Sequence, residues 1–269
     1  MSGLSIVIVS HNARAELEVC LASLTQSPPA DTEVIVVDNA SEDGSQAAVR
    51  RWPNVRFLEL PSNRGFAAAC NVGIRAGQGG MVLLLNSDTR VPHGAVDQLR
   101  RAIAERPDVA VIGPRLVDGE GRPELSFGSM IGPITEWRRR RVMRSLARQD
   151  PAAVAYVDAL TRREHSPDWV SGACMLVRRA DAEAVGLLDE RYFMYTEDVD
   201  FCAAIRARGR RILFTPSVEV VHLRGRSAAF APAATRAAYE QSHLAFYRKH
   251  HPGVAVALWA YRALRRRSR

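Results

Sequence analysis

The sequence predicts an α/β fold in which a mostly parallel sheet is flanked by helices on both faces. Short apolar runs rich in β-branched residues alternate with helical patterns over residues 4–88, the order of elements in a parallel sheet with crossover helices. A polar cluster follows each apolar run directly. The chain has 269 residues, of which 47% are hydrophobic and 25% charged, so it can bury a core without disulfides or structural metals.

Four predicted strands come first in the chain. The first is followed by a polar turn and then by Leu17, Leu21 and Leu24, a spacing typical of an amphipathic helix. A second helical pattern follows the third strand and ends at Gly77. The four strands are LSIVIV at 4–9, EVIVVD at 33–38, VRFLEL at 55–60 and MVLLL at 81–85.

The patterning is less uniform in the second half of the chain. A helix is expected from residue 92 to Arg106, followed by a strand at 109–117 whose Gly and Pro mark its end. Residues 118–168 are rich in arginine and lack strand alternation, which predicts a partly helical insertion. The later elements are a regular segment at 169–179, a helix at 180–185, a helix from the acidic segment to Gly209, and a strand at 211–216.

The chain is basic, with 37 Lys and Arg against 29 Asp and Glu, a formal charge of +8 and a pI near 9.9. This balance suits an anionic partner, which could be a nucleotide, a nucleic acid or a membrane surface. Lys249 is the single lysine, so the arginine excess also fits a biased genomic composition. Nucleic acid is disfavoured because aromatic residues are only 7% and none interrupts the arginine clusters.

The cysteines and the N-terminus indicate a cytoplasmic protein. Cys20, Cys70, Cys174 and Cys202 lie far apart and form no CxxC pair, which predicts reduced thiols rather than disulfides. The N-terminal residues lack the pattern of a signal peptide, and no apolar run reaches the ~18 to 20 residues of a membrane span.

Polar residues at the ends of the predicted strands should meet in one crevice, because ligands bind beyond the carboxyl ends of strands in such sheets. The residues expected there are His11, Asn12, Asp38, Asn39, Asn63, Arg64, Asn86 and Asp88. Asp38 has two interpretations: aspartate is common in turns after strands, and its carboxylate could accept the imide N–H of uracil or thymine.

Two acidic segments are candidates for chemistry. Asp88 lies just past an apolar strand, where its carboxylate could hold Mg²⁺ or Mn²⁺ or simply form a turn. Glu197, Asp198 and Asp200 crowd the start of a predicted helix, where acids interact well with the helix dipole. One of them could be a general base; the spacing is part of the reason to choose Asp198, and the resemblance given below is the main one.

A histidine ends the last apolar run. His222 is followed by Arg224 and Arg226, so it is either a structural side chain or a group that binds metal or diphosphate.

Seven of these segments, in this order, resemble the inverting nucleotide-sugar glycosyltransferases of family 2, which have the GT-A fold. The resemblance covers residues 4–227 and is strongest to bacterial rhamnosyltransferase-like enzymes of cell-surface polysaccharide synthesis. The segments are SIVIVSHN, VVDNASEDGS, NRGFAAACNVGIRAG, LLLNSDT, WVSGACMLVRR, FMYTEDVDFCAAIRARG and VVHLRGRS. The resemblance implies a Rossmann-like sheet and transfer of a sugar, rhamnose favoured, from a UDP- or dTDP-sugar to a hydroxyl of a polysaccharide or lipid-linked glycan.

The resemblance also implies roles for single residues. Asp198 would be the catalytic base, and Asp88 and His222 would hold a divalent metal, Mn²⁺ or Mg²⁺. The residues implied in nucleotide-sugar binding are Ser10, Asn12, Asp38, Asn63, Arg64, Asn86, Ser87, Asp88, Arg224 and Arg226. Those implied on the acceptor side are Trp169, Ser171, Gly172 and Glu197.

One departure from the family pattern concerns the metal. The Asp-x-Asp motif reads Asn86-Ser87-Asp88 here, so it has a single carboxylate. This leaves open a catalytically weak nucleotide-sugar-binding protein as an alternative. A sugar nucleotidyltransferase is a second alternative, but it would be expected to have a glycine-rich basic loop where SHNARAE stands. The same stretch lacks the GxGxxG pattern of a dinucleotide oxidoreductase.

The resemblance divides the chain into four parts of one continuous domain. Residues 1–117 would be the nucleotide-sugar half, 118–168 a variable insertion, 169–230 the acceptor and catalytic half, and 231–269 a helical basic tail.

Two arginine clusters, at 137–148 and 261–269, have two interpretations. They are either solvated charge or interfacial segments on an anionic membrane. A polyprenyl-linked acceptor would make a peripheral position on the inner face of the cell membrane useful. The sequence leaves the oligomeric state open.

Overall fold

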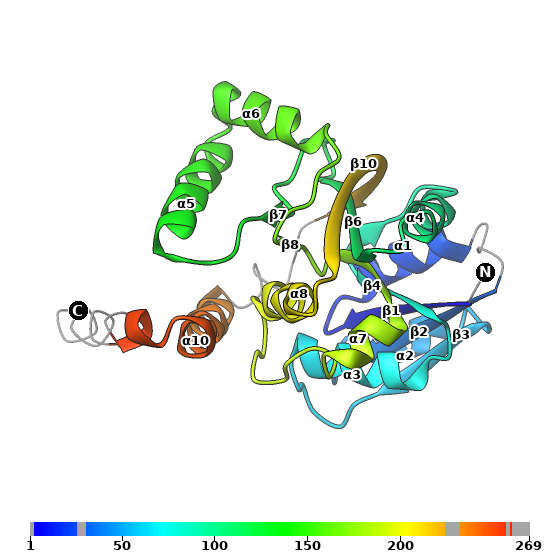
Figure 1. Ribbon diagram of the computed structural model, residues 1–269. Coiled ribbons are helices and arrows are strands. Elements are labelled where there is room, and N and C mark those ends of the chain that lie inside the picture. Colours follow the sequence, from blue (N-terminus) through cyan, green and yellow to red (C-terminus); the bar gives the residue numbers. More distant parts are fainter. Residues whose placement is uncertain (1–2, 26–30, 224–231, 257–258, 260–269) are drawn as a thin grey trace.

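An eight-stranded mixed sheet forms the centre of the part of the protein that the structure describes (Figure 1). The structure is a computed structural model and describes residues 3–25, 31–223, 232–256 and 259. The strand order is β3-β2-β1-β4-β9-β6-β10-β5. The first four strands in this order are mutually parallel, as are β6 and β10, whereas β9 runs antiparallel to both of its neighbours and β5 antiparallel to β10. The predicted mostly parallel sheet is therefore confirmed.

The longer strands coincide with the apolar runs of the sequence, because β-branched residues favour extended backbone. Strands β1, β2 and β4 are largely buried on both faces. The bounds of the strands are β1 Leu4–Ser10, β2 Thr32–Asp38, β3 Val55–Glu59, β4 Met81–Asn86, β5 Thr89–Arg90, β6 Val109–Val117, β9 Cys174–Arg178 and β10 Arg211–His222.

Helices cover both faces of the sheet, as predicted. Their bounds are α1 Arg14–Thr25, α2 Ser45–Val49, α3 Phe66–Ala76, α4 Ala95–Ala104, α7 Arg179–Ala184 and α8 Glu197–Ala207. On one face, alternate residues of β1 such as Ile6 pack with Leu17 of α1 and Leu99 of α4. On the other face, Val7 packs with Cys70 of α3 and with residues of α8. This alternation follows from the two-residue period of a strand.

The register of the parallel strands brings their carboxyl ends to one edge. Ser10 pairs with Asp38, and Asn86 pairs with Val9. The polar turns after β1, β2 and β4 therefore meet where the crevice was predicted.

Two strands differ in detail from the prediction. β6 covers the predicted residues 109–117 and continues through Gly113 and Pro114, which were expected to mark its end. It can do so because β9 pairs only with Val111 and Ile112, so no neighbour on that side requires the N–H that proline lacks. β10 is one strand from Arg211 to His222, with an irregular register between Thr215 and Glu219.

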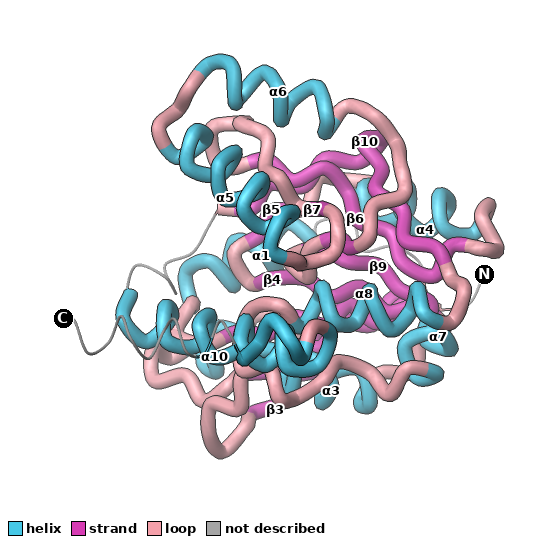
Figure 2. The backbone as a smooth tube through the Cα atoms, turned by 60° about the vertical axis from the view of Figure 1, so that its left-hand side comes forward, coloured by secondary structure: helices cyan, strands magenta, loops and turns pink. Residues whose placement is uncertain are grey.

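The arginine-rich insertion is partly helical, as expected. It contains α5, Pro133–Ala147, and α6, Pro151–Thr161, which project from one side of the sheet (Figures 1 and 2). The insertion also contains the short strand β7, Phe127–Gly128, which pairs with β8, Trp169–Val170. The alternation of residues did not predict β7, because two residues are too few to have a period.

The last long helix, α10, spans Pro232–His250 and lies beside α8 (Figure 1). The basic residues 260–269 and the segment 224–231 lie outside the described residues. No described helix is both long and apolar enough to cross a membrane. All four cysteines are buried and free.

Candidate active site

The turns after β2 and β3 are tied together at the carboxyl edge of the sheet. Asn39 donates from Nδ2 to Asn63 Oδ1 at 2.9 Å, and its Oδ1 accepts the N–H of Arg64 at 2.9 Å. Asn63 Oδ1 also accepts the N–H of Gly65 at 3.0 Å. The Arg64 guanidinium pairs with Glu190 at 3.2 Å. These contacts hold the loop after β3 against the end of β2.

Asn12 joins the turns after β1 and β2. Its N–H donates to Ser41 Oγ at 2.9 Å, and its Oδ1 accepts the N–H of Glu42 at 2.8 Å. The backbone of Asn12 has a φ of 49°, in the left-handed region that asparagine tolerates better than most residues. Asn12 is exposed at the predicted crevice, and its amide oxygen already serves the loop.

Ser10 and Asp38 present buried polar atoms without partners. Asp38 is 3% exposed; its Oδ2 accepts the N–H of Ser41 at 2.9 Å, whereas its Oδ1 has no partner among the described residues. The hydroxyl of Ser10, the paired residue on β1, also lacks one. Leaving a buried polar atom unpaired costs about 1 to 3 kcal/mol, so these two atoms are positioned to receive hydrogen bonds from a ligand or from water.

A carboxylate and an imidazole meet at the end of β4. Asp88 Oδ1 lies 3.3 Å from His222 Nε2, and Asn86 Nδ2 lies 3.4 Å from the same nitrogen. Asp88 and His222 are largely buried, and the strand pair β5–β10, which places His222 opposite Thr89, brings them together. Ser87 is buried beside them. The structure therefore unites the predicted metal residues Asp88 and His222.

Glu124 lies beside His222, and the sequence did not predict it. Asp88, His222 and Glu124 are called the metal corner below. Glu124 Oε2 lies 3.1 Å from His222 Nδ1. Burial alone would lower the pKa of His222, but the hydrogen bonds and charges of Asp88 and Glu124 raise it to about 9. Glu124 lies in the insertion, 98 residues before His222, and no local pattern marks it.

These residues fit a divalent metal that shares its ligands with a substrate. Within the described ranges, no group of three or more His, Cys, Asp or Glu side chains is arranged to hold a metal alone. Asp88 and His222 offer one oxygen and one nitrogen, a donor set suited to Mn²⁺ or Mg²⁺ when phosphate oxygens or waters fill the other positions. Glu124 would orient the imidazole from its other nitrogen, as outer-shell carboxylates commonly do.

The two arginines predicted to bind the diphosphate, Arg224 and Arg226, lie outside the described residues. The chain is described as far as Leu223, whose N–H donates to the carbonyl oxygen of Asp88 at 2.8 Å. This contact holds Leu223 beside Asp88.

Asp198 lies in the first turn of α8, held by two backbone donors. The N–H of Gly172 donates to Oδ2 at 3.0 Å, and the N–H of Val199 donates to Oδ1 at 2.8 Å. Burial raises the pKa of the Asp198 carboxyl, although these hydrogen bonds and the charge of Arg139 act to lower it. A carboxylate with a raised pKa and a fixed orientation has the properties of a general base.

The four residues predicted on the acceptor side fall into two groups. Ser171 and Gly172 border Asp198, and the Ser171 Oγ accepts the N–H of Ala173 at 3.3 Å. Trp169 and Glu197 are each only 6% exposed and face the core. The Trp169 ring is covered by the guanidinium of Arg139, 4.7 Å from the ring centroid. As the structure stands, these two side chains offer little surface to an acceptor.

Glu197 is a buried neighbour of the base candidate. Burial, followed by the charge of Asp198, raises its carboxyl pKa well above the ordinary value. Its Oε2 has no hydrogen-bond partner among the described residues. The two adjacent carboxyls therefore differ in environment, and Asp198 is the one that accepts two backbone hydrogen bonds.

The segment before α8 is strained and touches the donor-side loop. Tyr195 and Thr196 both have a φ of 68°, which is unusual for residues with a Cβ. Just before them, the carbonyl of Phe193 accepts the N–H of Phe66 at 2.7 Å. Gly65 makes this approach possible, because a Cβ there would lie 2.3 Å from the Phe193 oxygen. The loop after β3 is thus in direct contact with the segment that precedes Asp198.

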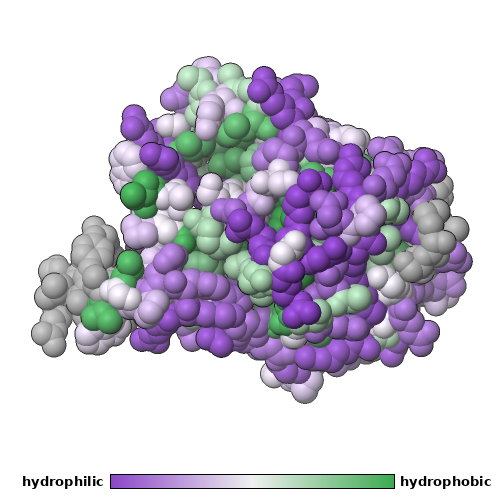
Figure 3. Space-filling model, viewed as in Figure 1, coloured by the Kyte–Doolittle hydropathy of each residue, from purple (hydrophilic) through white to green (hydrophobic). Residues whose placement is uncertain are grey.

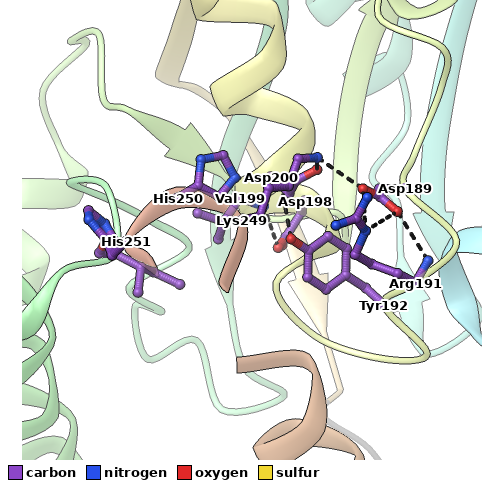
Figure 4. A network of polar contacts seen from close by, with 10 residues as sticks. Asp189, Arg191, Tyr192, Asp198, Val199, Asp200, Lys249, His250 and His251 are labelled. Carbon is purple, nitrogen blue, oxygen red and sulfur yellow. Dashed lines mark hydrogen bonds and ion pairs between the residues drawn. The ribbon is translucent and has the colours of Figure 1, made fainter. Parts of the chain in front are cut away.

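Asp200, two residues after Asp198, belongs to a separate structural network (Figure 4). Its carboxylate is 3% exposed and lies 2.8 Å from Lys249 Nζ and 2.6 Å from His250 Nε2. It also accepts the hydroxyl of Tyr192 at 3.1 Å, and Lys249 reaches Asp189 at 2.9 Å. Asp200 therefore fastens α10 to α8, whereas Asp198 faces Gly172.

The unpaired atoms at the ends of β1 and β2, the Asp88–His222 pair and the Asp198 carboxylate form an arrangement suited to group transfer on a sheet of the GT-A type. The chain belongs to glycosyl transferase family 2, whose model matches residues 5–186. It is therefore a glycosyltransferase, as its resemblance to the family predicted.

One relative illustrates this membership, and two solved structures share the fold. The chain is 34% identical to the N-acetylglucosaminyl-diphospho-decaprenol L-rhamnosyltransferase of Mycobacterium tuberculosis, over 93% of this chain and 85% of that protein. The fold is similar to that of a mannosyltransferase from Pyrobaculum calidifontis in complex with GDP-Man and Mn²⁺, with a TM-score of 0.64, 21% identity and coverage of 97% of this chain and 69% of the other. It also resembles GalNAc-T7 with UDP, GalNAc and Mn²⁺, with a TM-score of 0.61, 16% identity and coverage of 82% and 44%.

Proposed function

We propose that this protein transfers a sugar from a UDP- or dTDP-sugar, L-rhamnose favoured, to a hydroxyl of a lipid-linked glycan or cell-surface polysaccharide acceptor, with inversion at the anomeric carbon. The observation that carries the proposal is the oriented Asp198 carboxylate with a raised pKa, in the same sheet-edge site as the Asp88–His222 pair. The mycobacterial rhamnosyltransferase, whose name specifies a GlcNAc-diphospho-lipid substrate, supports the choice of sugar and acceptor. Family membership favours transfer over nucleotidyl transfer or simple binding.

The donor half of the site would be residues 1–117. Asp38 and Ser10 would bind the base through their unpaired oxygens, since an imide N–H needs an acceptor and a base carbonyl needs a donor. Asn12 would border the nucleotide, and Asn63 and Arg64 would lie along the phosphates. Once engaged in this way, the buried oxygens would no longer be unpaired.

The diphosphate would lie at the metal corner. Asp88 and His222 would hold Mn²⁺ or Mg²⁺, and Asn86, Ser87, Arg224 and Arg226 would surround the phosphates. When bound, the metal supplies neutralisation of the negative charge on the leaving diphosphate. Because position 86 is asparagine, the motif supplies one carboxylate instead of two. A bound metal would therefore depend more on oxygens of the substrate.

Asp198 would carry out the proton transfer. Its carboxylate takes the proton of the acceptor hydroxyl while that oxygen forms a bond to the anomeric carbon. The bond from the same carbon to the nucleoside diphosphate breaks on the opposite face, so configuration inverts. Gly172 and Val199 keep the carboxylate in position through their N–H groups. Ser171 and Gly172 would border the acceptor, with residues 169–230 forming the acceptor half.

The acceptor class would place the enzyme at the inner face of the cell membrane. Its lipid-linked substrate would be reached from the cytoplasm, with no nucleic acid involved. The C-terminal arginine cluster at 261–269 would contribute attraction to anionic lipid, and it lies outside the described residues.

Thermal stabilisation by UDP, dTDP and GDP and their sugars, with and without Mn²⁺, tests the donor assignment. We expect a metal-dependent shift for UDP or dTDP compounds that Asp88→Ala abolishes. Asp108→Ala is the matched control, because Asp108 is exposed and directly precedes β6 at the opposite edge of the sheet. Product analysis by NMR then reports the anomeric configuration. A retained configuration, or no shift with any nucleotide, would overturn the proposal.

A further inference from the structure

One face of α5 is exposed along its whole length and combines apolar and basic side chains. None of the 15 residues of this helix is buried. Ile134 is 67% and Trp137 61% exposed. The residues of this face, called the α5 face below, are Ile134, Trp137, Arg138, Arg141, Arg144 and Arg148. Their spacing of three or four residues places them on one side of the helix.

The arginines of the α5 face form no ion pair with the described residues. Among the described residues, no carboxylate lies within ion-pair distance of Arg138, Arg141, Arg144 or Arg148. The arginines on the other sides of the helix are used: Arg139 donates to the carbonyls of Phe127 and Leu125, and Arg140 pairs with Glu136 at 2.7 Å. Four unpaired guanidinium groups on one face leave a basic surface that suits an anionic partner.

Further exposed apolar side chains surround the start of α5. Tyr239 of α10 lies beside Glu136 and contacts Tyr195 edge to face, with 5.8 Å between ring centroids. At the other side, His251 bonds the carbonyl of Ile131 at 2.8 Å. The chain continues from there to Val254, Val256 and Trp259, which are all exposed. Figure 3 shows apolar and hydrophilic surface interspersed on the side of the molecule where α5 and α6 lie.

This surface borders the proposed base. Tyr195 is three residues before Asp198, and Arg139, on the inner side of α5, is close enough for its charge to act on the Asp198 carboxyl. Figures 1 and 2 both place α5, α8 and α10 on the same side of the sheet. The α5 face and the catalytic side of the molecule therefore form one continuous region.

We propose that the α5 face docks on an anionic lipid bilayer, an inference that rests on the proposed transfer to a lipid-linked acceptor. Exposed tryptophan, tyrosine and aliphatic side chains next to arginines are the composition of interfacial membrane helices. Such an orientation presents Asp198 to a glycan whose lipid tail stays in the bilayer. A nucleic acid would use the arginines but leave Ile134, Val254 and Val256 without partners, so lipid accounts for more of the surface.

Vesicle flotation of the full chain tests the docking. The probes are vesicles of phosphatidylcholine with and without phosphatidylglycerol. The test variant combines Arg138→Gln, Arg141→Gln and Arg144→Gln. The matched control combines Arg50→Gln, Arg101→Gln and Arg208→Gln, which are exposed on other elements and remove the same charge. A second variant, Trp137→Ala, tests the apolar part, and transfer to a water-soluble acceptor is measured for every variant.

We expect binding to the anionic vesicles alone. The test variant should lose at least about tenfold in affinity, because each arginine near the surface contributes about fivefold. The affinity of the control should stay within about twofold of that of the wild type. Raised salt should weaken the binding of the wild type and of the control. Trp137→Ala should weaken binding with transfer to the soluble acceptor unchanged, and the tryptophan fluorescence of the wild type should shift to the blue on anionic vesicles.

Several results would overturn the docking. The first is no binding to anionic vesicles. The second is an equal loss of vesicle affinity in the test and control variants, and the third is tighter binding to an RNA oligonucleotide than to vesicles. Intact transfer to the soluble acceptor with any of these would refute the docking surface alone. Absence of transfer in the wild type would refute the proposed function while the flotation result still stands.

Discussion

The site has two parts that are built in different ways. The donor edge is formed by the turns after β1, β2 and β3, and the reaction edge by Asp198 and the Asp88–His222 pair. At the donor edge, neighbouring turns are tied by short-range contacts such as Asn39 to Asn63, 24 residues apart. At the reaction edge, partners come from more distant segments: Glu124 reaches His222 across 98 residues, and Asn86 lies beside His222 across 136. The donor edge follows from the order of strands, whereas the reaction edge depends on how the insertion and the later strands fold back.

The largest expected effect is the loss of the base. Asp198→Asn should lower the turnover rate by about 10² to 10⁴, the usual contribution of a general base. Donor affinity should stay nearly constant, because the donor edge does not contain this residue. Steady-state kinetics together with calorimetric titration of the donor separate the two. A parallel loss of donor binding would show that the edges do not act separately.

Asp200→Asn is the matched control for that variant. It makes the same chemical change two residues further along α8, but at the carboxylate that holds Lys249 and His250. It should destabilise the protein, since Lys249 would lose a charged partner, while turnover per folded molecule is kept. A turnover loss as large as that of Asp198→Asn would contradict the assignment of the base.

The contact between the two edges predicts the next effect. Gly65 has a φ of 85°, and a Cβ there would collide with the Phe193 carbonyl. Gly65→Ala should therefore cost roughly 2 to 4 kcal/mol in the free energy of unfolding, from backbone strain and overpacking together. Urea unfolding measures it.

Gly121→Ala separates the two causes. Gly121 has a φ of 78° but nothing within 4 Å of an added Cβ. It should show the backbone cost alone, about 1 to 2 kcal/mol. Equal losses at the two glycines would mean that the contact with Phe193 does not constrain the site.

The metal corner predicts a smaller effect. Glu124→Gln keeps an acceptor near His222 Nδ1 but removes its charge, so Mn²⁺ affinity should fall about 10- to 100-fold, as for other outer-shell carboxylates. Calorimetric titration with Mn²⁺ in the presence of UDP measures this affinity. Glu120→Gln, an exposed glutamate of the same loop, should have no effect. Unchanged affinity in Glu124→Gln would remove Glu124 from the site.

The last prediction concerns the contact between α5 and α10, which lies outside the reaction edge. Glu136 of α5 lies 2.7 Å from His243 and 3.0 Å from Tyr247 of α10. Burial opposes ionisation, but His243 and Arg140 outweigh it and lower the pKa of Glu136 to about 2.

A lowered folded pKa contributes stability above the unfolded value near 4.5, and that stability is lost as the pH falls through the folded value. The loss should be about 3 kcal/mol between these limits, and Glu136→Gln should remove this part of the pH dependence. Urea unfolding across pH 2 to 6 measures it. An unchanged slope in the variant would contradict the role of Glu136.

The sequence by itself determined the order of strands and helices, the polar edge of the sheet and the family. These features are local: a strand or helix has its own residue period, and parallel connection places the carboxyl ends of strands together. Asp38, Asp88 and Asp198 could be singled out because each stands at the end of such an element.

Only the tertiary structure decided which side chains meet. It brought Glu124 to His222 and Arg139 to Asp198, attached Asp200 to α10, and buried Trp169, which the sequence predicted to face the acceptor. Contacts between residues far apart in the chain leave no periodic signal, because they depend on how whole elements pack. Burial and unpaired atoms, which distinguish a binding group from a turn residue, are likewise properties of the folded chain alone.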